Sequence, residues 1–126
     1  MKDNRISVVI NKPVEEVFEF STNPKNTSSW VEGIVGEETN EWPVKIGSIY
    51  RNQNRKGEWR EHTVSDFQQN RIFELLSKDG NYHVHYSYKD LGNSCELEYY
   101  EWVENGELAD TVTKHTLQKL KTAMEK

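Results

Sequence analysis

The stretch YHVHYSY, residues 82–88, alternates large apolar or aromatic side chains with polar ones. Successive side chains of a β-strand point to opposite faces of a sheet, so residues of the same parity share a face. The face with the greater apolar surface is predicted to point to the core, and it carries Tyr82, Val84, Tyr86 and Tyr88. The opposite face, with His83 and His85, is then predicted to point to solvent.

The spacing of His83 and His85 also permits a second interpretation, in which both rings bind a metal ion. A zinc site needs three or four converging ligands. This strand can supply only two, and no Cys or carboxylate is obviously placed in the sequence to complete the set. We therefore predict no metal site, and we predict no cofactor.

The next stretch, SCELEYYEW at residues 94–102, follows the same alternation and places Cys95, Leu97 and Tyr99 on the inner face, while Glu101 shares their parity and is left open. The turn signal DLGN lies between the two stretches and indicates an antiparallel hairpin. Short β-branched or aromatic runs separated by turn residues extend from residue 33 to residue 103. They predict strands near residues 33–39, 47–55, 58–67, 71–78, 81–89 and 94–103.

The segments on either side of this region complete the predicted fold. RISVVI, residues 5–10, predicts a first strand, and NKPVEEVFEFS, residues 11–21, predicts a short helix with Pro13 in its first turn. From Gly106 to the end, helical periodicity continues without Gly or Pro, which predicts a long C-terminal helix. This order indicates an α+β fold, in which a curved antiparallel sheet of about seven strands wraps around the final helix.

The inner face of the predicted final helix carries unusually small side chains, namely those of Ala109, Thr113, Thr116 and Ala123. Small side chains leave space between a helix and a sheet, and such space between apolar surfaces predicts a pocket. The alternative is that aromatic side chains of the sheet fill the space completely.

The strand near residues 58–67 has no clear inner face. If Val64 points inward, Arg60 and His62 do so as well, and a buried basic pair would favour an acidic or polar ligand. If Trp59 points inward instead, both basic residues lie on the surface. The alternation alone does not decide between these two arrangements.

Length and composition argue against several classes of protein. The 126 residues fit one domain, residues 1–126, and the net charge of −5 argues against nucleic-acid binding. No apolar run approaches the ~20 residues that cross a bilayer, so no membrane insertion is expected. The start of the chain lacks the apolar segment of a signal peptide, which predicts a cytoplasmic protein. The one cysteine, Cys95, excludes an intrachain disulfide.

Five stretches carry a resemblance to a known family: INKPVEEVFEFSTNPKNTSSW (10–30), KIGSIYR (45–51), HTVSDFQQNRIFEL (62–75), HYSYKDLGNSCELEYY (85–100) and LQKLKTAMEK (117–126). In their order and spacing the chain resembles the START-like helix-grip superfamily, in particular the bacterial polyketide cyclase/dehydrase and lipid-transport branch, also called SRPBCC. The resemblance implies one or two short helices after the first strand. It also implies a hydrophobic cavity between the sheet and the C-terminal helix.

The resemblance favours Val64 as an inward residue and therefore Arg60 and His62 as cavity residues. Together with the residues predicted to face the interior, this gives a predicted ligand-binding set of Arg60, His62, Val84, Tyr86, Tyr88, Leu97, Tyr99, Val112, Thr113, Thr116 and Leu120.

Three functions are compatible with this pattern. The preferred one is binding of a small hydrophobic or amphipathic molecule, such as a lipid or polyketide, in the cavity. The second is a cyclase- or dehydratase-like enzyme, in which His62 would act as general base and Arg60 or Tyr86 would stabilise an enolate. The third is a co-chaperone-like module for protein interaction. The sequence supplies candidate catalytic residues without an assembled dyad, and it indicates neither the ligand nor the oligomeric state.

Overall fold

A seven-stranded antiparallel sheet with the strand order β1-β7-β6-β5-β4-β3-β2 forms the body of the computed structural model, which describes residues 2–108 and 112–126. The strands are β1 (Asp3–Ile10), β2 (Ile34–Thr39), β3 (Ile49–Asn54), β4 (Trp59–Gln68), β5 (Ile72–Ser77), β6 (Tyr82–Asp90) and β7 (Cys95–Val103). The helices are α1 (Val14–Thr22), the short 3-10 helix η1 (Thr27–Ser29) and α2 (Lys114–Met124). The predicted α+β helix-grip architecture is therefore confirmed.

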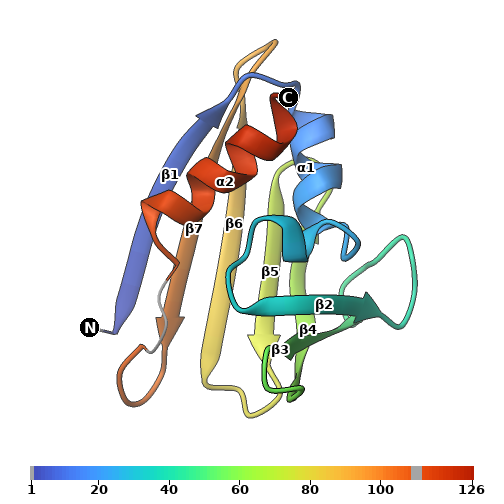
Figure 1. Ribbon diagram of the computed structural model, residues 1–126, viewed down its shortest axis with the longest axis vertical. Coiled ribbons are helices and arrows are strands. Elements are labelled where there is room, and N and C mark those ends of the chain that lie inside the picture. The colour runs from blue at the N-terminus through green and yellow to red at the C-terminus, as the bar shows by residue number, and fades with distance from the viewer. Residues whose placement is uncertain (1, 109–111) are drawn as a thin grey trace.

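The sheet is strongly curled, and its concave face holds the core. In Figure 1 the edge strand β2 crosses the view at a steep angle to β6 and β7, while α2 lies over β1 and β7. Inward side chains of facing strands meet in register, as where Tyr86 of β6 lies opposite Tyr99 of β7 and their rings pack edge to face at 5.2 Å. Edge-to-face packing suits the positive edge and negative face of aromatic rings. Aromatic residues therefore supply much of this core.

The predicted parity of β6 is confirmed. Val84, Tyr86 and Tyr88 are buried on the inner face, whereas His83 and His85 lie on the outer face. The outer histidines are partly covered, because the His83 ring stacks on Trp102 with a centroid distance of 4.3 Å.

Strand β4 resolves the arrangement that the sequence left open. Val64 is 1% exposed and His62 is 9% exposed, so this side of the strand faces inward, while Trp59 is exposed. The pairing with β5 shifts register between Val64 and Asp66, which marks a β-bulge. A bulge adds one unpaired residue and reverses the parity beyond it. Phe67 can therefore pack against the same core as Val64.

The C-terminal helix is shorter than predicted. It begins at Lys114 and has 11 residues, so the prediction that Val112 and Thr113 lie on this helix was wrong. Thr113 is the N-cap, and its side chain accepts a hydrogen bond from the Thr116 N–H. A Thr at this position satisfies a backbone donor that the first helical turn leaves free, so the helix begins there. Leu108 is also non-helical, and Ala109 lies outside the described residues.

Among the described residues, no helix covers one end of the concave face. In Figure 1 the lower ends of β5, β6 and β7 extend well beyond α2. Leu75 is paired with the inward residues Val64 and Val84, yet its side chain is only partly buried. Tyr82, at the start of β6, is partly buried as well. In the part of the chain that the structure describes, no helix is long and apolar enough to span a membrane.

Candidate functional site

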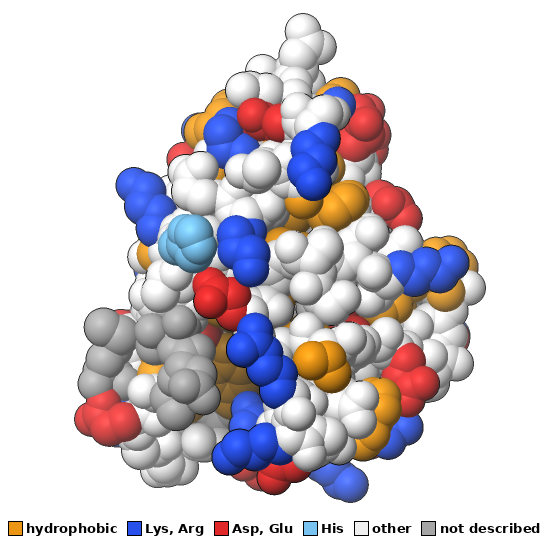
Figure 2. Space-filling view, viewed as in Figure 1, with side chains coloured by type: hydrophobic (Ala, Val, Ile, Leu, Met, Phe, Trp, Pro, Cys, Tyr) orange, Lys and Arg blue, Asp and Glu red, His pale blue; other side chains and the backbone are white. Residues whose placement is uncertain are grey.

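The concave face divides into an apolar end beneath α2 and a polar end that α2 does not cover. At the apolar end Ile10, Leu97 and Leu120 are fully buried. Strand register places inward residues of β2, β3, β4 and β5 side by side at the other end, in two rows: Glu37–Asn52–Arg60 and Tyr50–His62–Ser77. Figure 2 shows this lower end hollowed, with hydrophobic side chains on its floor and Lys or Arg side chains beside it.

His62 is the central side chain of the polar end. It is 9% exposed, and its Nδ1 has no hydrogen-bond partner among the residues that the structure describes. Its ring packs against Tyr82 with a centroid distance of 6.2 Å. Burial lowers the pKa of His62, nearby Arg60 lowers it further, and Asp79 acts in the opposite direction. The ring is therefore neutral near pH 7 and offers one N–H donor and one nitrogen acceptor.

Arg60 lies at the rim of this end, on the same face of β4 as His62, with its side chain exposed. The positive charge of Arg60 acts to lower the pKa values of both His62 and Tyr82. Within residues 2–108 and 112–126 it has no hydrogen bond or ion pair. A guanidinium carries five N–H donors and no acceptor. Within the described chain, Arg60 thus has donors that no acceptor uses.

Glu101, on the inner face of β7, is fully buried and holds neighbouring segments together. Its carboxylate accepts hydrogen bonds from the Tyr82 hydroxyl at 2.5 Å, the Asn4 side-chain amide at 2.8 Å and the Val112 N–H at 2.9 Å. Asn4 also donates to the Val112 carbonyl at 2.7 Å. We call Glu101, Asn4 and Val112 the clamp, because their hydrogen bonds fix the backbone two residues before α2 against β1 and β7.

A half-buried carboxyl group, that of Glu37, lies where β2 meets η1. The Thr27 hydroxyl donates to the Glu37 carboxyl at 2.6 Å. Burial raises the pKa of Glu37 to about 7, although hydrogen bonds from Thr27 and Asn52 act in the lowering direction. Nearby, Trp30 is 1% exposed and its indole N–H has no hydrogen-bond partner in the described chain. The Trp30 ring packs edge to face on Tyr86 with a centroid distance of 6.4 Å.

The residues predicted to bind a ligand occupy several parts of the molecule. The buried members are His62, Val84, Tyr86, Tyr88, Leu97, Tyr99, Thr116 and Leu120. Tyr88 belongs to the end near α1, where its hydroxyl forms a 2.7 Å hydrogen bond with Ser21. Arg60 is at the open rim, Val112 is half-buried in the clamp, and Thr113 is an exposed cap. Their roles in ligand binding stay predictions.

The outer-face histidines are not brought together with other metal ligands. His83 Nε2 lies 2.8 Å from the Glu104 carboxylate, and His85 Nδ1 lies 2.7 Å from the Glu74 carboxylate. Across the described residues, no three His, Cys, Asp or Glu side chains are grouped so that they could hold one ion. Each histidine thus has its own carboxylate partner.

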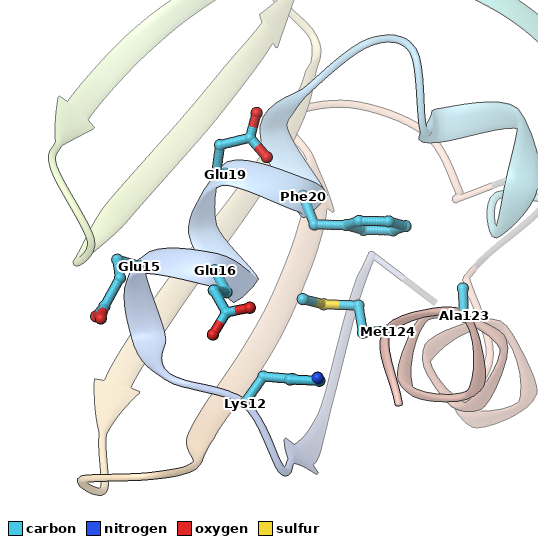
Figure 3. Close-up of a pocket in the computed structure, with 7 residues that line it drawn as sticks. All are labelled: Lys12, Glu15, Glu16, Glu19, Phe20, Ala123 and Met124. Atoms are coloured by element: carbon cyan, nitrogen blue, oxygen red, sulfur yellow. The ribbon is translucent and has the colours of Figure 1, made fainter. Parts of the chain in front are cut away.

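Two surface hollows lie outside the concave face. One, of about 380 Å³, is lined by Lys12, Glu15, Glu16, Glu19, Phe20, Ala123 and Met124. Figure 3 shows Phe20 and Met124 extending into the space between α1 and α2. The other, of about 250 Å³, is lined by Ser7, Val8, Val9, Glu96, Lys114, Gln118 and Lys121. Neither contains a residue of the predicted ligand-binding set, so the cavity between sheet and helix stays a prediction.

The small residues that suggested that cavity do not form one surface. Ala123 lines the hollow between the helices, and Thr113 is exposed. Thr116 is buried, but its hydroxyl takes part in the capping box of α2. The prediction of one small inner surface was wrong, because the helix begins later and its first turn uses threonines as caps.

Sequence reasoning did not include Trp30, Glu37 or Glu101 in the site. Glu101 shares the parity of Leu97 and Tyr99, and an acidic residue at an inward position is a signal that could have identified it. Glu37 had no such signal, because a register shift between Ile34 and Gly36 changes the parity of β2.

Comparisons with known proteins support the fold. No family model and no curated protein matches the sequence. An uncharacterized protein from Bacillus thuringiensis has a similar structure, with a TM-score of 0.76 and 15% identity over 98% of this chain and 99% of that one.

Two further structures are similar to this chain. The Polyketide_cyc-like protein Cgl2372 from Corynebacterium glutamicum aligns with a TM-score of 0.61 and 19% identity, over 80% of this chain and 64% of that one. The di-domain ARO/CYC protein BexL from the BE-7585A biosynthetic pathway aligns with a TM-score of 0.76 and 12% identity, over 99% of this chain and 47% of that one. The chain therefore shares its fold with these proteins, and this is the fold that the sequence resemblance implied.

Proposed function

We propose that this protein binds a small amphipathic molecule on its concave face. The apolar part of the molecule would lie against inward aliphatic and aromatic side chains such as Leu75 and Val84. Its polar part would lie at the uncovered end, beside His62. The name Polyketide_cyc-like, which one similar structure carries, supports a ligand of this general kind.

The observation that carries this proposal is the unpartnered Nδ1 of His62. Buried polar groups in folded proteins nearly always have a hydrogen-bond partner, because an unsatisfied group costs about 1–3 kcal/mol. His62 faces inward between Tyr50 and Ser77 of the neighbouring strands, and its ring packs against Tyr82. A bound molecule with a polar group at this point would supply the missing hydrogen bond.

A second candidate function is general-base catalysis by His62, and one observation supports it. Burial lowers the pKa of His62 and keeps its ring neutral, as a base requires. Catalysis also needs a partner that orients the base or stabilises developing charge. Arg60 is near enough to influence the His62 pKa, but no hydrogen bond joins the two within the described chain. Binding is therefore the function that we prefer.

A pair of neighbouring substitutions tests the binding site. Leu75→Trp would place a large ring on the partly open inner face of β5, whereas Leu76→Trp would place the same ring on the outer face. Nile red, a neutral dye that fluoresces in apolar surroundings, serves as the probe. We expect the wild-type protein and Leu76→Trp to bind the dye with similar affinity, and Leu75→Trp to lose at least about tenfold of it, since the ring fills the space.

Circular dichroism and thermal unfolding establish that both variants are folded. Equal dye binding by the two folded variants would exclude the concave face as the site. Absence of dye binding by the wild-type protein would contradict the proposed function itself.

A further inference from the structure

The polar end of the concave face has an excess of hydrogen-bond donors. Its acidic groups are already supplied with donors from the chain: Tyr82, Asn4 and the Val112 N–H bind Glu101. Asp79, at the nearby turn, receives the Ser77 hydroxyl at 2.6 Å and the Asn81 N–H at 3.0 Å. A bound cation is therefore not needed to satisfy these carboxylates.

The side chains at this end that have no partner in the described chain are basic rather than acidic. The guanidinium of Arg60 can only donate, and in the described chain it has no acceptor. His62 Nδ1 is also unpartnered, although its ring is nine-tenths buried. A neutral imidazole presents an N–H on one of its nitrogens, so His62 can add a second donor beside Arg60. Arg60 therefore favours a molecule with acceptor oxygens, and His62 adds a donor to it in the tautomer that carries the proton on Nδ1.

The charge of the surroundings limits how negative that molecule can be. Arg60 supplies one positive charge, while Asp79 and the fully buried Glu101 lie within electrostatic reach of His62 and Tyr82 respectively. A phosphate monoester would bring close to two negative charges into this acidic neighbourhood. A carboxylate brings one charge, and its two oxygens match the two-pronged geometry of a guanidinium.

We propose that Arg60 and His62 bind the carboxylate of an amphipathic monocarboxylic acid, whose apolar chain then extends over the inner face of the sheet toward α2. This inference rests on the proposed binding function and specifies its ligand class. His62 donates a hydrogen bond to the carboxylate on its buried side, and Arg60 donates to it at the rim. The assignment explains why one basic side chain is buried and neutral while its neighbour is exposed and charged.

A matched pair of probes separates this inference from the proposed function. Dansyl-undecanoic acid and its methyl ester share the same fluorophore and chain, and they differ only in the charged group. Fluorescence titration near pH 7 gives the dissociation constant of each. We expect the acid to bind about tenfold more tightly than the ester, as suits a charge-assisted hydrogen bond.

Substitutions then assign the preference to residues. Arg60→Gln should abolish the tenfold preference by weakening acid binding while leaving ester binding unchanged. Arg55→Gln is the matched control, because Arg55 is an exposed arginine in the neighbouring β3–β4 turn. His62→Gln should also reduce the preference, and this second variant tests the buried part of the contact.

Each outcome has a definite meaning. Equal affinity of the wild-type protein for acid and ester would overturn the carboxylate site while leaving the proposed function standing. An equal loss in Arg55→Gln and Arg60→Gln would show a general effect of charge and would also overturn it. If neither probe binds, the proposed function fails and the inference fails with it.

Discussion

At the scale of single residues, Glu37 makes the free energy of unfolding depend on pH. In the folded protein its pKa is about 7, raised by burial from an ordinary value of 4.5. Between these two values the folded state holds a proton that the unfolded state has released. The free energy of unfolding therefore falls as the pH rises through this window, and it is lower above pH 7 than at pH 4 by up to about 3 kcal/mol from this group.

Glu37→Gln should remove this dependence, since an amide of the same shape does not ionise. We expect the variant to gain stability relative to the wild-type protein as the pH rises from about 4.5 to about 7. Urea unfolding at a series of pH values measures the difference. The control is Glu38→Gln, whose exposed side chain is bonded to Arg51, and it should keep the wild-type slope. Parallel curves for wild type and Glu37→Gln would show that Glu37 is not the group responsible.

His62 is expected to titrate below the ordinary histidine pKa, because burial and Arg60 both favour its neutral form. Its contribution to stability is therefore present above the unfolded pKa and is lost as the pH falls through the folded pKa. An NMR titration of the imidazole resonances measures the value directly. Exposed His115 on α2 serves as the reference in the same spectra. Added dansyl-undecanoic acid should raise the pKa of His62, because a nearby anion favours the charged ring. A His62 pKa that does not respond to the acid would place the carboxylate elsewhere.

At the scale of elements, the clamp determines where the last segment of the chain is held. The N–H and the carbonyl of Val112 are bonded to Glu101 and Asn4 respectively, two residues before α2 begins. The first turn of the helix is then closed by Thr113 and Thr116 through their capping box. The position of α2 on the sheet thus depends on a fully buried carboxylate as well as on apolar packing.

Glu101→Gln should destabilise the protein by about 2–4 kcal/mol, because an amide replaces one acceptor oxygen by a donor and leaves buried donors unpaired. Urea unfolding measures the loss. Hydrogen exchange should show the largest gain at the amides of Val112 and the first turn of α2. Glu98→Gln is the control, because Glu98 forms an exposed ion pair with Arg5 on the outer face and should cost no more than about 1 kcal/mol. Similar losses in the two variants would mean that the clamp has no special role.

The elements also show where sequence reasoning succeeds. The strands from β2 to β7 were predictable because their alternation and turn residues are local signals. The start of α2 was not, since periodicity alone continues through Val112 and Thr113, and the capping Thr becomes recognisable only from its hydrogen bond to Thr116. The inner face of β4 was left open because a bulge allows both Val64 and Phe67 to reach the core.

At the scale of the whole molecule, the sequence predicted the fold more completely than the candidate site. The fold depends on the number, order and parity of strands, which the chain displays in its pattern. The site depends on pairs that are distant in sequence, such as Asn4 with Glu101 and Thr27 with Glu37. Which buried polar groups find partners, and which do not, is decided only when the sheet curls and brings those segments together.

The uncovered end of the concave face has a kinetic consequence. A molecule bound there can leave along the open ends of β5, β6 and β7 without first detaching α2 or breaking the clamp. Its residence time is then set by its own contacts with the sheet rather than by the rate at which the protein opens. Under the proposed binding function, release of the ligand would then require no conformational change of the protein.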